Sequence, residues 1–74
     1  MILMKNICID EKIKSGKPVI KGTRVPVDLI LGKLASGMTY EEVMREYDIT
    51  RQDILSALEY ASAYISEDEI KAVV

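Results

Sequence analysis

The sequence contains no histidine, and Cys8 is its only cysteine. A single thiol excludes a disulfide within the chain. Without histidine there is no Cys–His zinc site and no Cys–His or Ser–His catalytic pair. The Gly-x-Ser-x-Gly motif of hydrolases is missing, and so is a phosphate loop that ends in Lys-Ser or Lys-Thr. We therefore expect no enzymatic activity, no bound metal and no cofactor.

Long apolar runs are also missing. The first twelve residues are apolar but charged from Lys5 onward, which is too short for a membrane span and lacks the cleavage site of a signal peptide. A lone thiol fits a reducing compartment. We expect a cytoplasmic protein with no membrane contact.

With 74 residues, the chain is short enough for one domain, and a core of that size gives a thin stability margin. Apolar residues make up 49% of the sequence. Burying part of that surface against a second copy is the simplest source of extra stability. We predict a homodimer.

The charges are distributed unevenly along the chain. Residues 1–26 carry six bases and two acids, a net charge of +4, and residues 27–74 carry four bases and ten acids, a net charge of −6. This asymmetry is consistent with a polyanionic partner at the basic front or with self-complementary packing. An ordinary solvated surface of mixed charge is the third interpretation.

The N-terminal third is predicted to be extended. Residues 2–9 are rich in β-branched side chains and predict one strand. Residues 18–25 predict a second extended segment that begins at Pro18, which is tolerated at a strand start. Lys21-Gly22, inside that segment, can form a tight hairpin turn.

Helix signals fill the rest of the chain. Pro26 suits the first residue of a helix over 26–36, and Gly37 would end it. Three further helices, over 40–47, 51–64 and 67–73, are each preceded by a hydroxyl cap with an acidic residue three positions later. These capping pairs are Thr39 with Glu42, Thr50 with Asp53, and Ser66 with Glu69.

The helices predicted over 40–47 and 51–64 are close enough along the chain to form a helix-turn-helix with a shared core. Asp48 is the expected turn residue, because its short polar side chain tolerates the left-handed conformation. Ile49 would plug the turn from inside.

If residues 51–64 form a recognition helix, its first outward side chains would contact base edges, and front bases would contact phosphates. The candidate DNA-binding residues are Thr50, Arg51, Gln52 and Ser56, with Arg24, Lys21 and Lys17 from the front. Asp53 and Glu59 make the helix acidic. The alternative is therefore a helix-turn-helix that serves only as a scaffold.

The sequence leaves two interpretations open for Arg24 and two for the Tyr60–Tyr64 pair. We expect Thr23 to fix the corner between the second extended segment and the first helix. Arg24 either supports that corner by pairing with Asp28 or contacts a phosphate. Tyr60 and Tyr64, one helical turn apart, form either part of the core or a stripe that binds a partner.

The run "GKPVIKGTRV" over residues 16–25 closely resembles the core motif of the domain of unknown function 433 family. The Gly37-Met38 step and the Ala57-Leu58-x-Tyr60-Ala61 run support this resemblance, which covers residues 7–64. Members are described as predicted antitoxins with a homeodomain-like helix-turn-helix. The chain departs from the family at residues 47–50, where "YDIT" replaces the Pro-x-Leu-Thr of many members.

The resemblance implies an antitoxin that binds a nuclease-type toxin and, as a dimer, represses its own operon by binding double-stranded DNA. The acidic segment from Ser66 would meet a basic toxin surface. The alternative is a protein–protein interaction module with no DNA-binding activity.

The predicted fold is a single, mainly α domain over residues 1–74. It has a β segment over 1–25, a three-helix homeodomain-like helix-turn-helix over 26–64 and a short C-terminal helix over 65–74.

Overall fold

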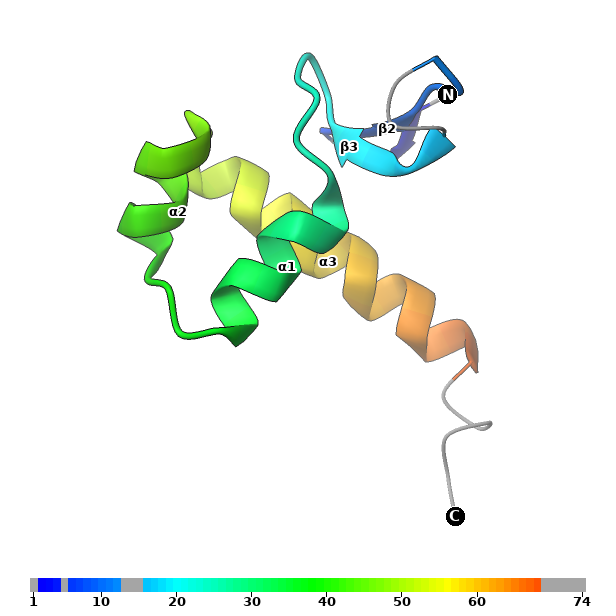
Figure 1. Ribbon diagram of the computed structural model, residues 1–74. Coiled ribbons are helices and arrows are strands. Elements are labelled where there is room, and N and C mark those ends of the chain that lie inside the picture. The colour runs from blue at the N-terminus through cyan, green and yellow to red at the C-terminus, as the bar shows by residue number, and fades with distance from the viewer. Residues whose placement is uncertain (1, 5, 13–15, 69–74) are drawn as a thin grey trace.

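Three short strands precede three helices in a computed structural model that describes residues 2–4, 6–12 and 16–68. Figure 1 shows the small sheet on one side of α1 and α3, with α2 beside the start of α3 and away from its other end. This arrangement confirms the predicted mainly α fold with an N-terminal β segment. The elements are β1 (Ile2–Met4), β2 (Ile7–Ile9), β3 (Pro18–Ile20), α1 (Val27–Ala35), α2 (Tyr40–Tyr47) and α3 (Arg51–Asp68).

The sheet is antiparallel, in the order β1-β2-β3. Cys8 lies opposite Val19 in the register of β2 and β3. The prediction of one strand over residues 2–9 is wrong, because the chain reverses between β1 and β2. Asn6 makes this reversal possible with a φ of 67°, a left-handed conformation that asparagine adopts more readily than most residues.

A β-turn follows β3 directly. The N–H of Thr23 donates to the carbonyl of Ile20 at 3.0 Å, and Gly22 takes the third turn position with a φ of 80°. The predicted turn at Lys21-Gly22 is therefore confirmed. The second half of the predicted extended segment forms no strand. It returns to β3 at its end, where the Val25 carbonyl accepts from the Ile20 N–H at 2.9 Å and Pro26 forms an isolated bridge to Val19.

Thr23 fixes this corner as predicted. Its hydroxyl donates to the Ile20 carbonyl at 2.7 Å and accepts from the Val25 N–H at 2.9 Å. One side chain therefore holds both sides of the turn that leads from the sheet into α1.

Capping motifs define both ends of the connection between α1 and α2. Gly37, with a φ of 105°, donates to the Leu34 carbonyl at 3.0 Å, and Met38 donates to the Lys33 carbonyl at 3.2 Å. These two bonds form a Schellman motif, so Gly37 ends α1 as predicted. Thr39 then starts α2 with a complete capping box.

The turn between α2 and α3 follows the prediction. Asp48 ends α2 in the left-handed conformation, with φ 54° and ψ 50°. Ile49 is buried, with 6% of its surface exposed. Thr50 and Asp53 cap α3 reciprocally, with bonds of 3.0 and 3.1 Å. Two short helices and their shared core therefore form the expected helix-turn-helix.

The prediction for the C-terminus is wrong in one respect. α3 continues through residues 65–68, so Ser66 lies inside this helix and does not cap a new one. Residues 61–68 contain neither glycine nor proline, so nothing in the sequence interrupts the helix there. The remainder of the predicted last helix lies outside the described residues.

The core joins the sheet to all three helices. Its buried apolar residues are Ile7, Val19, Ile20, Val27, Ile30, Val43, Ile49, Ile54 and Ala57. None of the helices in the described ranges combines the length and apolar character that a membrane crossing requires.

Candidate functional site

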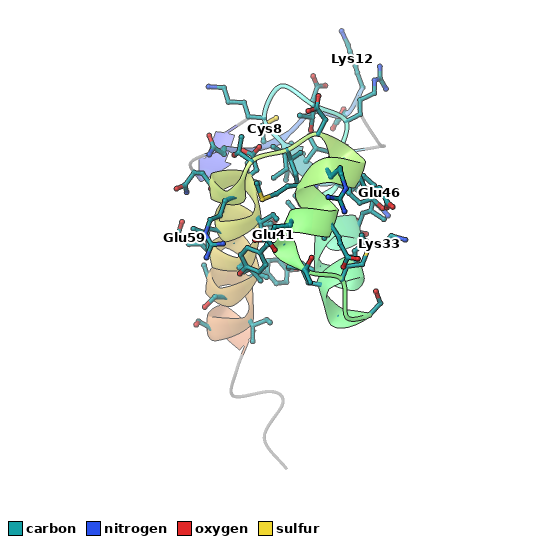
Figure 2. All side chains as sticks on the ribbon, turned by 90° about the vertical axis from the view of Figure 1, so that its left-hand side faces the viewer. Cys8, Lys12, Lys33, Glu41, Glu46 and Glu59 are labelled. Atoms are coloured by element: carbon teal, nitrogen blue, oxygen red, sulfur yellow. The ribbon has the colours of Figure 1, made fainter. Side chains whose placement is uncertain are left out.

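The surface formed by α2, the turn and the first half of α3, here called the acidic face, carries an excess of negative charge. Figure 2 views the molecule from the α2 side, with Glu41, Glu46 and Glu59 labelled. Its acidic residues are Glu41, Glu42, Glu46, Asp48, Asp53 and Glu59, and its bases are Arg45 and Arg51. Six acids against two bases give a formal net charge of −4.

Glu42 is the capping acid of α2. The backbone N–H of Thr39 donates to Glu42 at 2.8 Å, and the Thr39 hydroxyl also bonds to it. These bonds hold the pKa of Glu42 below its ordinary value of 4.5. Capping therefore strengthens the helix and keeps Glu42 ionised to lower pH than an uncapped glutamate.

Arg51 and Gln52 are exposed at the start of α3, as predicted for a recognition helix. The guanidinium of Arg51 lies 4.9 Å from the ring centroid of Tyr40, a cation–π contact between α2 and α3. Thr50 is exposed as well, but its hydroxyl is engaged in the cap of α3. Of the predicted residues on α3, Arg51 and Gln52 are thus the best placed to meet a partner.

The prediction that Ser56 faces outward is wrong, because only 1% of its surface is exposed. Its hydroxyl accepts from the side-chain amide of Gln52 at 3.3 Å and from that of Asn6 at 3.4 Å. Ser56 therefore joins α3 to the N-terminal sheet and cannot contact DNA. Sequence reasoning missed Asn6, although a lone asparagine in a β-branched run signals a turn.

The three basic residues predicted at the front of the chain, Lys17, Lys21 and Arg24, do not form one group in the structure. The backbone N–H of Lys21 donates to the Asn6 carbonyl at 2.7 Å. Lys21 is exposed in the turn after β3, and this bond joins its backbone to the reversal between β1 and β2. Arg24 is exposed, and no ion pair in the described part of the chain includes it.

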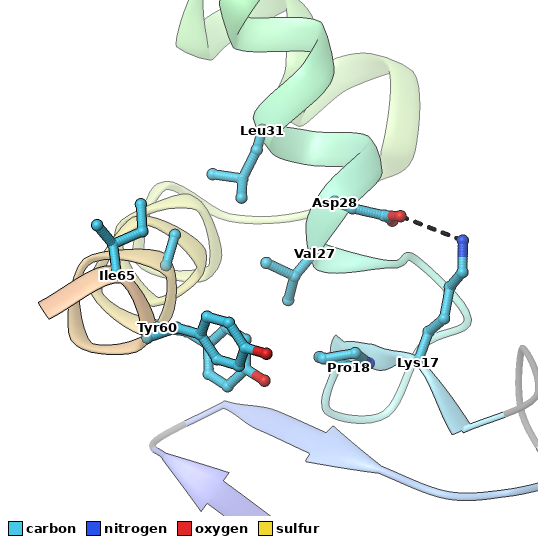
Figure 3. Close-up of a pocket in the computed structure, with 9 residues that line it drawn as sticks. Lys17, Pro18, Val27, Asp28, Leu31, Tyr60 and Ile65 are labelled. Atoms are coloured by element: carbon cyan, nitrogen blue, oxygen red, sulfur yellow. Dashed lines mark hydrogen bonds and ion pairs between the residues drawn. The ribbon is translucent and has the colours of Figure 1, made fainter. Parts of the chain in front are cut away.

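Lys17 belongs to a different surface. Its ammonium lies 3.2 Å from the Asp28 carboxylate, so the partner predicted for Arg24 is taken by Lys17. This ion pair crosses the rim of a pocket of about 360 Å³ between the start of β3, the first turns of α1 and the second half of α3 (Figure 3). We call this pocket the groove.

The groove is mainly apolar. Pro18, Val27 and Leu31 line one side, and Tyr60, Tyr64 and Ile65 line the other. The rings of Tyr60 and Tyr64 lie 6.3 Å apart, which confirms that they share one face of α3. Tyr60 packs against the core, whereas 62% of Tyr64 is exposed. Tyr60 therefore belongs to the core, whereas Tyr64 does not, and a partner contact at Tyr64 stays a prediction.

Within residues 2–4, 6–12 and 16–68, no three His, Cys, Asp or Glu residues are grouped so that they could hold a metal ion. What the geometry offers is two surfaces for binding, the acidic face and the groove.

The fold is a small helix-turn-helix with an N-terminal antiparallel sheet. Residues 7–61 match the model of a family described as "Protein of unknown function (DUF433)". The match covers well over half of the chain, which therefore belongs to this family, as its motifs predict.

Two relatives show how far the likeness extends. An uncharacterized protein of Archaeoglobus fulgidus is 60% identical over 25 residues, which are 34% of this chain and 69% of that protein. The crystal structure of Rv2018 from Mycobacterium tuberculosis matches with a TM-score of 0.66 and 34% identity, over 72% of this chain. The chain spans only 25% of the Rv2018 chain.

Proposed function

We propose that this protein is an antitoxin that binds a nuclease-type toxin stoichiometrically and masks it, acting as a homodimer. The family resemblance supports this function. The acidic face and the groove support it as well, because both suit the binding of another molecule. The observation that carries the proposal is the net charge of −4 on the acidic face.

Nucleases must hold a phosphate backbone, and proteins do this with surfaces rich in lysine and arginine. A face with six acids and two bases has the opposite sign to such a surface. Complementary charge speeds the encounter of two proteins and fixes their orientation. The acidic face is thus suited to cover the substrate-binding surface of a nuclease.

Operator DNA is a second candidate partner, favoured by a specific observation. The helix-turn-helix presents Arg51 and Gln52 outward, and Lys21 and Arg24 are exposed bases of the N-terminal part. Arginine and glutamine side chains can read guanine and adenine edges. The acidic residues nearby repel phosphates, so DNA binding would depend on front bases supplied by both copies of a dimer.

Charge reversal on the acidic face tests the antitoxin proposal. Glu41 and Glu46 are exposed and take no part in a capping pair. In calorimetric titration with the toxin encoded by the neighbouring reading frame, the double variant Glu41→Lys with Glu46→Lys should bind at least about tenfold more weakly, because like charges would then oppose each other.

Glu11 provides the matched control, because it is exposed and lies outside the acidic face. The Glu11→Lys variant reverses one charge, as Glu41→Lys alone does; it should bind as tightly as the wild type, whereas Glu41→Lys should bind more weakly. Equal affinity for the reversed acidic face and the wild type would refute the proposed toxin surface.

A gel-shift titration with operator DNA tests the second partner. Arg51→Ala should weaken specific binding if α3 reads the site, and far-UV circular dichroism would show whether loss of the Tyr40 contact changes the fold. Unchanged affinity would reject α3 as a recognition helix. Toxin binding without any gel shift would identify a protein-binding module with no DNA-binding activity.

A further inference from the structure

Leu55 is a large apolar side chain that the fold leaves on the surface of the first half of α3. Its exposed fraction is 42%, and the other exposed large apolar side chains in the described part of the chain are Tyr64 and Ile65. Those two border the groove, whereas Leu55 does not. A single exposed leucine is ordinary on a protein surface, so its surroundings decide whether it has a role.

The neighbours of Leu55 along α3 form an exposed strip. Arg51 precedes it by four residues, Gln52 precedes it by three, and Glu59 follows it by four. Such spacings place side chains next to one another on the surface of a helix. All three neighbours are exposed. We call these four residues the α3 strip.

Two long side chains of the α3 strip are held by contacts within the chain. The guanidinium of Arg51 lies 4.9 Å from the ring centroid of Tyr40. The side-chain amide of Gln52 donates to the buried hydroxyl of Ser56 at 3.3 Å. Long polar side chains lose conformational freedom when a partner fixes them, and this loss weakens binding. Because Arg51 and Gln52 are already restrained, a partner that covers the α3 strip loses less affinity in this way.

The acids around the α3 strip are available to a partner. The acidic face carries six acids and two bases, all of them in the described residues. None of these six acids takes part in an ion pair within residues 2–4, 6–12 and 16–68. An apolar centre surrounded by polar and charged groups is the usual anatomy of a protein–protein interface. Leu55 and the acids around it have this arrangement.

The sign of the charge selects one kind of occupant. A nucleic acid would bring its phosphates toward six carboxylates, and a second copy would bring an equal charge of −4 against this face. Both contacts would be repulsive. A protein with a surface rich in lysine and arginine would be attracted, and a nuclease has such a surface because it binds phosphates.

We propose that Leu55 is the apolar anchor of the toxin interface, where it packs against apolar atoms within the basic surface of the toxin. This inference rests on the proposed toxin binding and assigns its two rates to different residues. Leu55 slows dissociation, because its buried surface must return to water when the complex opens. The acids around it speed association through long-range attraction.

Surface plasmon resonance with the purified product of the neighbouring reading frame measures both rates. Leu55→Ala should raise the dissociation rate roughly tenfold and leave the association rate within about twofold, since it removes apolar contact and no charge. The ratio of its dissociation rate to that of the wild type should be the same at low and high salt. An unchanged dissociation rate in Leu55→Ala would refute the anchor.

The double variant Glu41→Lys with Glu46→Lys should show the opposite pattern. Its association rate should fall at about 0.1 M salt, because the attraction that guides the encounter is reversed. The difference from the wild type should shrink at about 1 M salt, where the Debye length falls from about 10 Å to about 3 Å. A salt-dependent loss in Leu55→Ala would contradict its role as an apolar contact.

Ile65 supplies the matched control on the same helix. It is also an exposed apolar residue, 64% accessible, but it lies in the groove and outside the acidic face. Ile65→Ala removes as many carbon atoms as Leu55→Ala and should leave both rates unchanged. Equal acceleration of dissociation by the two variants would overturn the proposal. Circular dichroism should show that both variants keep the fold, since both positions are exposed.

Photo-cross-linking identifies the molecule that covers Leu55. A chain with Leu55→benzoylphenylalanine should form a covalent adduct with the toxin, and a chain with Ile65→benzoylphenylalanine should not. An adduct between two copies of the chain, formed in place of the toxin adduct, would overturn the proposed occupant.

The outcomes separate this inference from the proposed function. A wild-type chain that does not bind the product of the neighbouring reading frame overturns both together. Binding that the Glu41→Lys and Glu46→Lys double variant weakens, but that Leu55→Ala leaves unchanged, overturns the anchor alone.

Discussion

Gly32 and Gly37 allow the same substitution to be tested at two sites with opposite expected results. Both belong to the region of α1, and a Cβ atom added at either position meets nothing within 4 Å. Steric packing therefore cannot distinguish Gly32→Ala from Gly37→Ala. The difference between them should come from the backbone alone.

Gly32 lies inside α1 with an ordinary helical conformation, so alanine there should stabilise the fold by about 0.5–1 kcal/mol. Gly37 has a φ of 105°, outside the conformations that alanine prefers. A non-glycine residue in the left-handed conformation destabilises the fold by about 1–2 kcal/mol. Alanine also restricts the unfolded chain more than glycine does, which stabilises the fold by about 0.4–1 kcal/mol. Gly37→Ala should therefore destabilise the fold by about 1 kcal/mol.

Urea unfolding and thermal melting, followed by circular dichroism, measure both variants against the wild type. The two variants should differ by about 2 kcal/mol, or roughly 10 °C in Tm for a domain of this size. Protein concentration must be equal in all samples, since association of two copies would add to stability. Stability changes of the same sign in both variants would refute the reasoning.

Two further predictions concern capping and the link between α3 and the sheet. Because the folded pKa of Glu42 is depressed, its stabilising effect is present above pH 4.5 and is lost as the pH falls through the folded pKa. The stability difference between wild type and Glu42→Gln, measured by urea unfolding, should therefore shrink below pH 4.5; a constant difference would contradict this. Ser56→Ala should cost about 1 kcal/mol, because Asn6 and Gln52 lose their shared acceptor. The same denaturation experiment should show little further loss when Asn6→Gly is added to that variant, because glycine also accepts the φ of 67° found at this position.

Local signals in the sequence predicted the helical part of the fold well. The Thr39 and Thr50 caps, the stop at Gly37 and the left-handed Asp48 all use contacts between residues at most five positions apart. Such contacts depend on residue type and spacing alone. They are therefore readable before any tertiary structure is known.

Errors arose where distant segments decide the outcome. Ser56 was predicted to face outward because its position fits the outer side of a recognition helix. Its burial depends on Asn6, fifty residues earlier, which approaches α3 only because the chain reverses between β1 and β2. Periodicity along α3 contains no information about that approach.

The groove shows the same limit. Sequence spacing placed Tyr60 and Tyr64 on one face but could not decide between core and partner contact. The outcome depends on where α1 and β3 end relative to α3, which leaves Tyr60 packed and Tyr64 exposed. The ion pair of Asp28 is a similar case. Arg24 was the expected partner because it is near in sequence, but Lys17, eleven residues away, forms the pair.

The length of α3 has a consequence for a complex with the toxin. Arg51 at its start and Ile65 near its end are fourteen residues apart, about 21 Å along a helix. A protein that covers the acidic face at the start of α3 would therefore leave the groove near the end of this helix uncovered.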